Sequence, residues 1–288
     1  MNLDLRMDLA DCGSPERLLE VLLRYYPDLP RRVPVETIAA DVGIIEFKTL
    51  EVEGFIGGLL ADPEKNQGII LTKDGLSAKR KRYTQGHELG HFLIPSHGYQ
   101  RQCRKEDLEE NSRTTTYQQQ EAEANRFSAG FLMPKPIFVK DMGALGSVEV
   151  THVRQLSDLY EVSMEASANR YAELTPDNCA FIFSRDGIVR YGRASRSFPR
   201  LAMRKGTPLP QNCLTRRFNQ TGTHSAWAEQ HGGAWIEIET GVRAPTILEQ
   251  VVCQSNGFKV TLLYIDEAEE EDREEYDGLA ERWNARLR

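Results

Sequence analysis

The sequence lacks two features that would point to a membrane or to nucleic acid. A helix that spans a bilayer needs about 18 or more apolar residues in succession, and no such run occurs in these 288 residues. The net charge of −7 argues against nucleic-acid binding as the main activity. The segment MNLDLRMDLADCGSPE carries acidic residues where an export signal would be basic and then apolar. These absences predict a cytoplasmic protein without a membrane partner.

Cysteine is scarce and widely spaced. The five cysteines contain no C-x-x-C pair, which excludes a cysteine-based zinc knuckle and argues against a disulfide framework. They are therefore expected to be free thiols: Cys12, Cys103, Cys179, Cys213 and Cys253. Hydrophobic residues at 40% and charged residues at 27% are ordinary globular values, and the length allows two or three domains.

Hydrophobic periodicity predicts alternating helices and short strands in the first half of the chain. Ser14 and Pro15 are typical of a helix start. The expected elements, in order, are helices over 14–26 and 33–43, strands over 44–50, 54–61 and 68–74, and helices over 76–94 and 119–133. Residues 97–120 are almost entirely polar, so we expect an exposed segment there that covers or shapes a cleft.

The second half changes character near Pro176. Residues 147–174 have the spacing of a helix-turn-helix, but the second helix is poor in the side chains that read DNA, which argues against direct DNA binding. Beyond 176, the sequence predicts a hairpin turning at Asp186-Gly187, three further strands (234–240, 246–254 and 259–266) and a terminal helix.

The segment YTQGHELGHFL contains the chemistry-bearing motif. His87 and His91 are four residues apart, so on a helix they face the same side and can hold one metal ion. Glu88 follows the first histidine and suits the general base of a metallopeptidase. A catalytic zinc takes three protein ligands and keeps one open position, so a third ligand is needed.

Three residues compete for that third position. His97 has a suitable spacing but lacks the glycine turn that would bring it round, because Ile94 and Pro95 stand there; it is expected to be a surface histidine. Glu121 opens the following amphipathic helix and is preferred, with Glu123 as the fallback. Asn125 shares the face of Glu121 and is expected to hydrogen-bond a ligand imidazole.

Two segments together, RYTQGHELGHFLIPSHG and EAEANRFSAGFLMP, resemble the signature of the ImmA/IrrE family of zinc-dependent peptidases. The resemblance covers roughly residues 14–140 and is strongest to the long IrrE-type regulators of the radiation response. It implies zinc held by His87, His91 and Glu121, with Glu88 as general base. Gly86 departs from the family, where alanine is common, and is expected to matter little.

The resemblance implies an α+β chain in three parts. These are a gluzincin-like minimal metallopeptidase domain with helices and a small three-stranded sheet (1–140), a helix-turn-helix-like segment (141–176) and a GAF-like α/β sensor domain (177–288). Members of the family cut helix-turn-helix repressors, so the expected partner is such a repressor, cleaved at one site in a DNA-damage or radiation response. A small signal molecule is a candidate ligand of the C-terminal domain.

Two alternatives stay open at this point. Mn²⁺ is the other metal to consider besides Zn²⁺. The rival function is a non-catalytic transcriptional regulator or sensor built on a peptidase-like scaffold. Glu88 argues against that rival, because a purely structural zinc site has no use for a general base.

Overall fold

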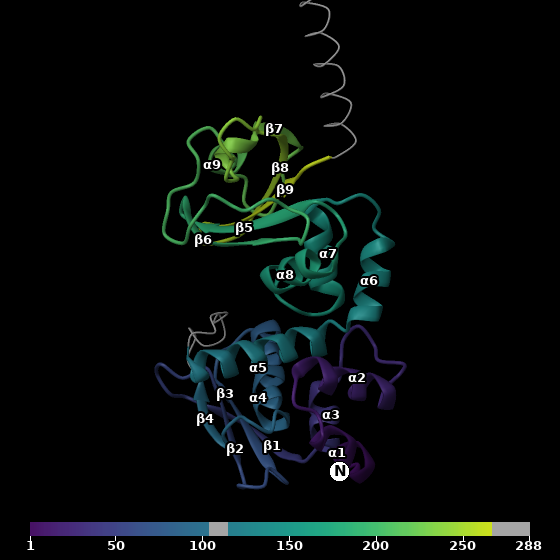
Figure 1. Cartoon of the computed structure of the whole chain (residues 1–288). Helices are drawn as coiled ribbons and strands as arrows, with labels where there is room; N and C mark the ends of the chain where they lie inside the picture. The colour runs from purple at the N-terminus through teal and green to yellow at the C-terminus, as the bar shows by residue number, and fades with distance from the viewer. Residues whose placement is uncertain (104–114, 267–288) are drawn as a thin grey trace, which may run out of the picture. The chain divides into compact units, whose positions relative to one another are not determined.

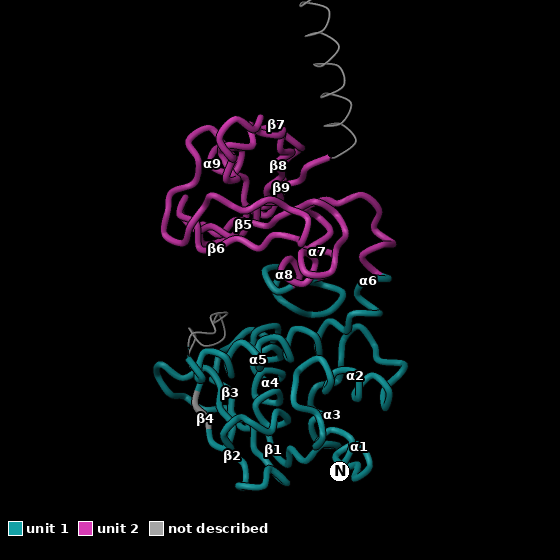
Figure 2. The backbone as a smooth tube through the Cα atoms, viewed as in Figure 1, with its two compact units in different colours: residues 1–140, 157–166 teal, residues 141–156, 167–288 magenta. Residues whose placement is uncertain are grey.

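The computed structural model describes residues 1–103 and 115–266, and its chain divides into two compact units (Figure 2). Unit 1 comprises residues 1–140 and 157–166, and unit 2 comprises residues 141–156 and 167–288. Helices and strands occur in both, so the α+β class is confirmed. The division into 1–140, 141–176 and 177–288 stays a prediction.

Unit 1 joins helices to one small sheet (Figure 1). Its elements are α1 (Leu3–Ala10), α2 (Pro15–Tyr25), α3 (Val35–Asp41), β1 (Ile44–Leu50), β2 (Gly57–Ala61), β3 (Gly68–Lys73), α4 (Ala78–Leu93), β4 (Gln100–Cys103) and α5 (Thr116–Leu132). Side chains cap α2 and α5 at their N-termini, and the cap of α2 is the one expected from the sequence. Ser14 accepts from Arg17 N at the start of α2, and Thr115 and Gln118 form a capping box at the start of α5.

The sheet of unit 1 has the strand order β1-β3-β2-β4. β1 pairs with β3 in parallel, while β2 pairs antiparallel with both β3 and β4. The three strands expected from the sequence are present. The expectation of an exposed polar loop was wrong for residues 100–103, which form the edge strand β4. Four residues are too few to show a strand period, and backbone pairing to β2 holds them in place.

Helices α4 and α5 pack against each other, and α4 lies against strands β2 and β3 (Figure 1). Glycines let the two helix backbones approach. A Cβ added to Gly86 would lie 2.7 Å from Ser128 Oγ, and one added to Gly90 would lie 3.0 Å from Phe127 Cδ1. A side chain at Gly86 would therefore meet α5, a packing role that the helix-propensity argument did not consider.

Three helices contain residues of both units: α6 (Lys135–Gly143), α7 (Val150–Leu159) and α8 (Met164–Leu174). The last two match the predicted helix pair of residues 147–174. Arg170, the arginine of α8, is buried and forms an ion pair with Glu173 at 3.0 Å.

Unit 2 is built on a five-stranded antiparallel sheet, ordered β6-β5-β9-β8-β7. Its further elements are β5 (Cys179–Arg185), β6 (Ile188–Ala194), α9 (Leu214–Arg217), β7 (Ala228–His231), η2 (Gly232–Ala234), β8 (Thr246–Cys253) and β9 (Phe258–Tyr264). Asp186 and Gly187 both have positive φ at the β5–β6 turn, as their sequence predicted.

Two elements predicted for unit 2 are not seen among the described residues. Residues 234–240 do not form the predicted strand: a 3-10 helix ends at Ala234, and Ile236 makes only an isolated bridge to Leu201. Trp235 and Ile236 are buried in the core of unit 2. The apolar residues in this stretch are therefore explained by core packing and do not indicate a strand. The predicted terminal helix falls in residues 267–288, outside the described residues. Among the helices described, none combines the length and apolarity needed to span a bilayer.

Candidate metal centre

Helix α4 carries the two histidines into the interior of unit 1. His87 and His91 are both fully buried, and their Nε2 atoms lie 3.1 Å apart. The helix begins at Ser77, which accepts from Arg80 N, and ends near Ile94. At that end, the Lys65 ammonium donates to the carbonyls of His91 and Ile94, each at 2.8 Å. The helix end beside His91 is thereby stabilised by a positive charge.

Helix α5 supplies the carboxylate. Glu121 is fully buried, with Oε2 3.1 Å from His87 Nε2 and Oε1 3.5 Å from His91 Nε2. Burial alone would raise the pKa of Glu121, but the hydrogen bonds and charges of His87 and His91 hold that pKa well below its ordinary value. The carboxylate is therefore ionised between two imidazoles, which is the state a metal ligand requires.

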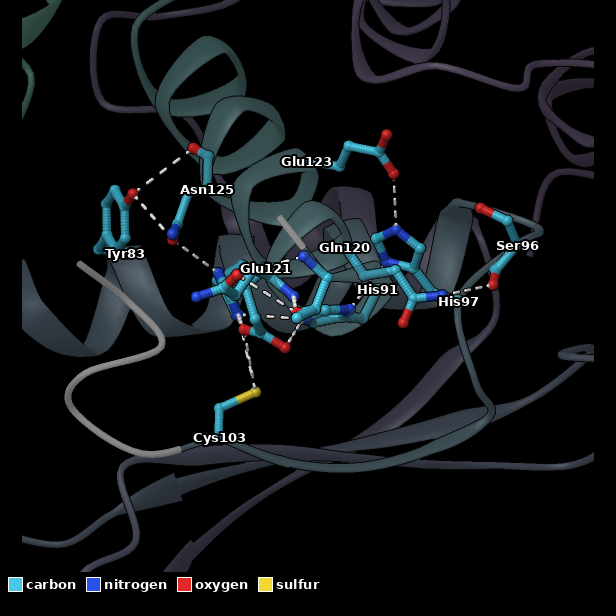
Figure 3. Close-up of polar contacts among 12 residues, drawn as sticks. Tyr83, His91, Ser96, His97, Cys103, Gln120, Glu121, Glu123 and Asn125 are labelled. Carbon is cyan, nitrogen blue, oxygen red and sulfur yellow. Dashed lines mark hydrogen bonds and ion pairs between the residues drawn. The ribbon is translucent and has the colours of Figure 1, made fainter. Parts of the chain in front are cut away.

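Asn125 orients the first imidazole. Its Oδ1 lies 2.9 Å from His87 Nδ1, on the opposite side of the ring from Glu121. An amide oxygen only accepts, so Nδ1 donates a proton to it, and Nε2 is the nitrogen of His87 that faces the cluster. Tyr83 donates to the same Oδ1 at 3.3 Å, and Figure 3 shows both side chains on one side of the site.

His97 and Glu123 orient the second imidazole. His97 Nε2 lies 3.0 Å from Glu123 Oε2, and His97 Nδ1 lies 2.8 Å from His91 Nδ1. With Nε2 of a neutral His97 donating to the carboxylate, its Nδ1 accepts from His91 Nδ1, and Nε2 is the nitrogen of His91 that faces the cluster. The expectation of a surface histidine was wrong, because His97 is only 3% exposed. Figure 3 shows its ring between Glu123 and the cluster.

Cys103 on β4 completes the cluster and was not anticipated from the sequence. It is fully buried, with Sγ 3.7 Å from His87 Nε2 and 3.9 Å from Glu121 Oε2. Figure 3 shows the sulfur pointing from its strand toward Glu121. Ligand-type atoms of His87, His91, Cys103 and Glu121 all lie within 4.8 Å of one another.

The spacing and protonation of these atoms fit a tetrahedral zinc ion. Metal–ligand lengths of about 2.0–2.1 Å for nitrogen and about 2.3 Å for sulfur place two nitrogens about 3.3 Å apart, and a nitrogen and a sulfur about 3.5 Å apart. The corresponding distances here are 3.1 Å and 3.7 Å. The Nε2 atoms of His87 and His91 face an ionised carboxylate, so a cation that displaced their protons would be held by all three side chains. Nitrogen and sulfur donors favour zinc over Mn²⁺.

Glu88, on the same helix as the two histidines, lies against strand β2. It is fully buried, and a Cβ added to Gly57 would lie 2.6 Å from its Oε1. Gly57 in turn pairs with Cys103 across β2 and β4. Gly57 of β2 therefore lies next to both Glu88, the proposed base, and Cys103.

The structure brings together the residues predicted as ligands, His87, His91 and Glu121, and places Asn125 against a ligand ring. The fallback Glu123 lies outside the cluster and contacts His97 instead. One signal could have revealed Cys103: it is the cysteine closest in sequence to the two histidines, in the segment between the two helices of the site.

One comparison with known proteins, a family model, agrees with the motif. Residues 46–171 match the peptidase family model described as "IrrE N-terminal-like domain", which confirms the resemblance to the ImmA/IrrE family. No match was found among curated proteins. A solved structure described as "Mycobacterium tuberculosis transcriptional regulator" is similar at 12% identity with a TM-score of 0.49, covering 91% of this chain and 76% of that one.

Proposed function

We propose that this chain, which carries an IrrE N-terminal-like domain of the ImmA/IrrE type, is a zinc-dependent endopeptidase that switches transcription. The observation that supports it most is the buried cluster of His87, His91 and Glu121 with Glu88 on the same helix as the histidines. The family model supports a metallopeptidase. Zinc as the resident metal and a gluzincin-like core are part of the proposal.

The side chains have separate tasks in peptide hydrolysis. A bound zinc supplies Lewis acidity, polarising a carbonyl and lowering the pKa of a bound water toward about 7. Glu88 takes the proton of the attacking water and passes it to the leaving amine. Asn125 and the pair of His97 and Glu123 hold the imidazoles in the tautomer that binds a cation.

The proposed substrate is a helix-turn-helix repressor, cleaved at one site so that stress or DNA-damage genes are released. A protein substrate is favoured over DNA as the direct partner, because Arg170 of α8 is buried in an ion pair with Glu173 and cannot reach phosphates. The C-terminal region, residues 177–288, is proposed to be a GAF-like sensor that receives a small signal molecule. The proposed location is the cytoplasm.

The competing function is a non-catalytic regulator that uses the same scaffold. Mass spectrometry of a helix-turn-helix repressor from the same genome separates the two, after incubation with zinc-loaded protein. The variants are Glu88→Gln, which removes the base but keeps the size, and Glu20→Gln, which changes an exposed carboxylate of α2.

We expect one cut in the repressor with the unchanged protein and with Glu20→Gln, and none with Glu88→Gln at equal zinc content. Cleavage that persists in Glu88→Gln would contradict the role of Glu88. If none of the three proteins cuts any repressor of that genome while each holds one zinc, the non-catalytic regulator is the better account.

A further inference from the structure

Cys103 lies on the edge strand of the sheet, beside the strand that contacts Glu88. Its strand β4 is the edge of the sheet and pairs antiparallel with β2, and Ile56 N donates to Cys103 O at 3.1 Å. β2 is also the strand that lies against Glu88. An extended peptide commonly binds a sheet by adding a strand to its edge. The edge of β2 beside the proposed base is thus already filled by the chain's own β4.

The sulfur of Cys103 lies among the ligand-type atoms of the site. It lies 3.7 Å from His87 Nε2 and 3.9 Å from Glu121 Oε2, close to the separation of about 3.5 Å expected between a sulfur and another ligand of one tetrahedral zinc. The other buried cysteine of unit 1, Cys12, instead donates to a helix carbonyl, that of Asp8. Two cysteines of similar burial therefore have different surroundings.

We propose that Cys103 is the fourth ligand of the metal, so that the resting site is closed by two nitrogens, one carboxylate oxygen and one sulfur. A catalytic zinc needs an open position for water, and Sγ fills it. This inference rests on the proposed peptidase function. It implies that the enzyme is latent while Cys103 binds the metal. The thiolate and β4 together occupy the positions of the attacking water and of the substrate strand.

Activation is then a ligand exchange coupled to strand release. The bond between the ion and Sγ breaks, the thiolate takes a proton from solvent, and a water molecule fills the position; no electron is transferred. β4 is only four residues long and is paired along one side alone. Detaching a short edge strand breaks few hydrogen bonds. A substrate strand that pairs with β2 would replace the hydrogen bonds that β4 had made.

A closed four-ligand site is also typical of structural zinc, and two measurements distinguish latency from that alternative. The first is X-ray absorption at the zinc edge on the full chain, which reports sulfur at about 2.3 Å from the ion. We expect one sulfur per zinc in the unchanged protein and in Cys12→Ala, and none in Cys103→Ala or Cys103→Ser. Absence of sulfur in the unchanged protein overturns the proposal, whatever the cleavage results.

The second measurement is the rate of repressor cleavage by the same zinc-loaded proteins. Latency predicts that Cys103→Ala cuts about tenfold faster or more than the unchanged protein and Cys12→Ala. Circular dichroism shows which variants are folded, and Cys103→Ser serves if the alanine variant is not. Sulfur on the metal without any gain in rate overturns latency. Sulfur on the metal with no cleavage by any variant keeps the ligand assignment and rejects the peptidase function instead.

Discussion

His91 Nδ1 and His97 Nδ1 lie 2.8 Å apart. Through His97, this contact connects the imidazole of His91, a proposed metal ligand, to the carboxylate of Glu123. A residue just past the end of α4 thereby determines which nitrogen of His91 faces the cluster. The site depends on more side chains than the three proposed ligands.

The first prediction tests that link. His97→Ala leaves His91 Nδ1 without its acceptor, and loss of such a partner typically lowers metal affinity 10- to 100-fold. Competition with a chromophoric zinc chelator measures the change. His224→Ala, at an exposed histidine of unit 2, should bind zinc as the unchanged protein does. Equal affinity in both variants would show that His97 has no part in holding the metal.

The second prediction concerns the approach of β2 to Glu88. In Gly57→Ala, the new methyl group would meet Thr84 Cγ2 and lie 2.6 Å from Glu88 Oε1, so both side chains must move. A positioned general base contributes about 10²- to 10⁴-fold to rate, so cleavage should fall by that order while zinc content is unchanged. Gly13→Ala, where no atom lies within 4 Å of the added carbon, provides the control. A Gly57→Ala enzyme of full activity would show that Glu88 is not held by this contact.

Local patterns accounted for the part of the site that lies within two helices. The i, i+4 spacing placed His87 and His91 together, and the amphipathic second helix placed Glu121 and Asn125 on one face. Cys103 and His97 could not be placed in the same way. Their positions depend on how residues 94–103 return to the sheet, which follows from backbone pairing with β2 and not from any periodicity.

The same limit explains the errors in the fold. The hairpin at Asp186-Gly187 was predictable, because that turn favours residues that tolerate positive φ. The alternation in residues 234–240 was not a strand, because Trp235 and Ile236 fill the core of unit 2 from a loop. In a short apolar stretch, a buried strand and a loop that fills the core have the same sequence pattern.

The third prediction addresses the C-terminal end of α4. Lys65→Met removes an ammonium that donates to two helix carbonyls and leaves the left-handed φ of 52° to another non-glycine residue. Hydrogen bonds to a charged group contribute about 1–3 kcal/mol, so the free energy of unfolding in urea should fall by about that amount. Lys48→Met, at an exposed ion pair with Glu46, should change it by less than about 0.5 kcal/mol. Equal effects of the two substitutions would contradict a special role for Lys65.

The fourth prediction is a pH dependence. Burial raises the pKa of Tyr83 to about 12 from an ordinary value of 10.0. The folded state thus keeps this proton longer than the unfolded state, so the contribution to stability is complete below pH 10 and is lost as the pH rises toward 12. In Tyr83→Phe this loss, at most about 3 kcal/mol, should disappear. Urea unfolding at pH 8 and pH 11 measures it, and an identical pH dependence in both proteins would refute the assignment.

The most direct test of the central claim is the zinc content of three purified proteins, measured by inductively coupled plasma mass spectrometry after dialysis. The unchanged protein and Glu123→Gln should each retain one zinc per chain, and Glu121→Gln should lose most of it, because Glu121 and not Glu123 lies in the cluster. Retention of zinc by Glu121→Gln together with its loss from Glu123→Gln would move the site to the other carboxylate. No zinc in the unchanged protein would contradict the metal centre altogether.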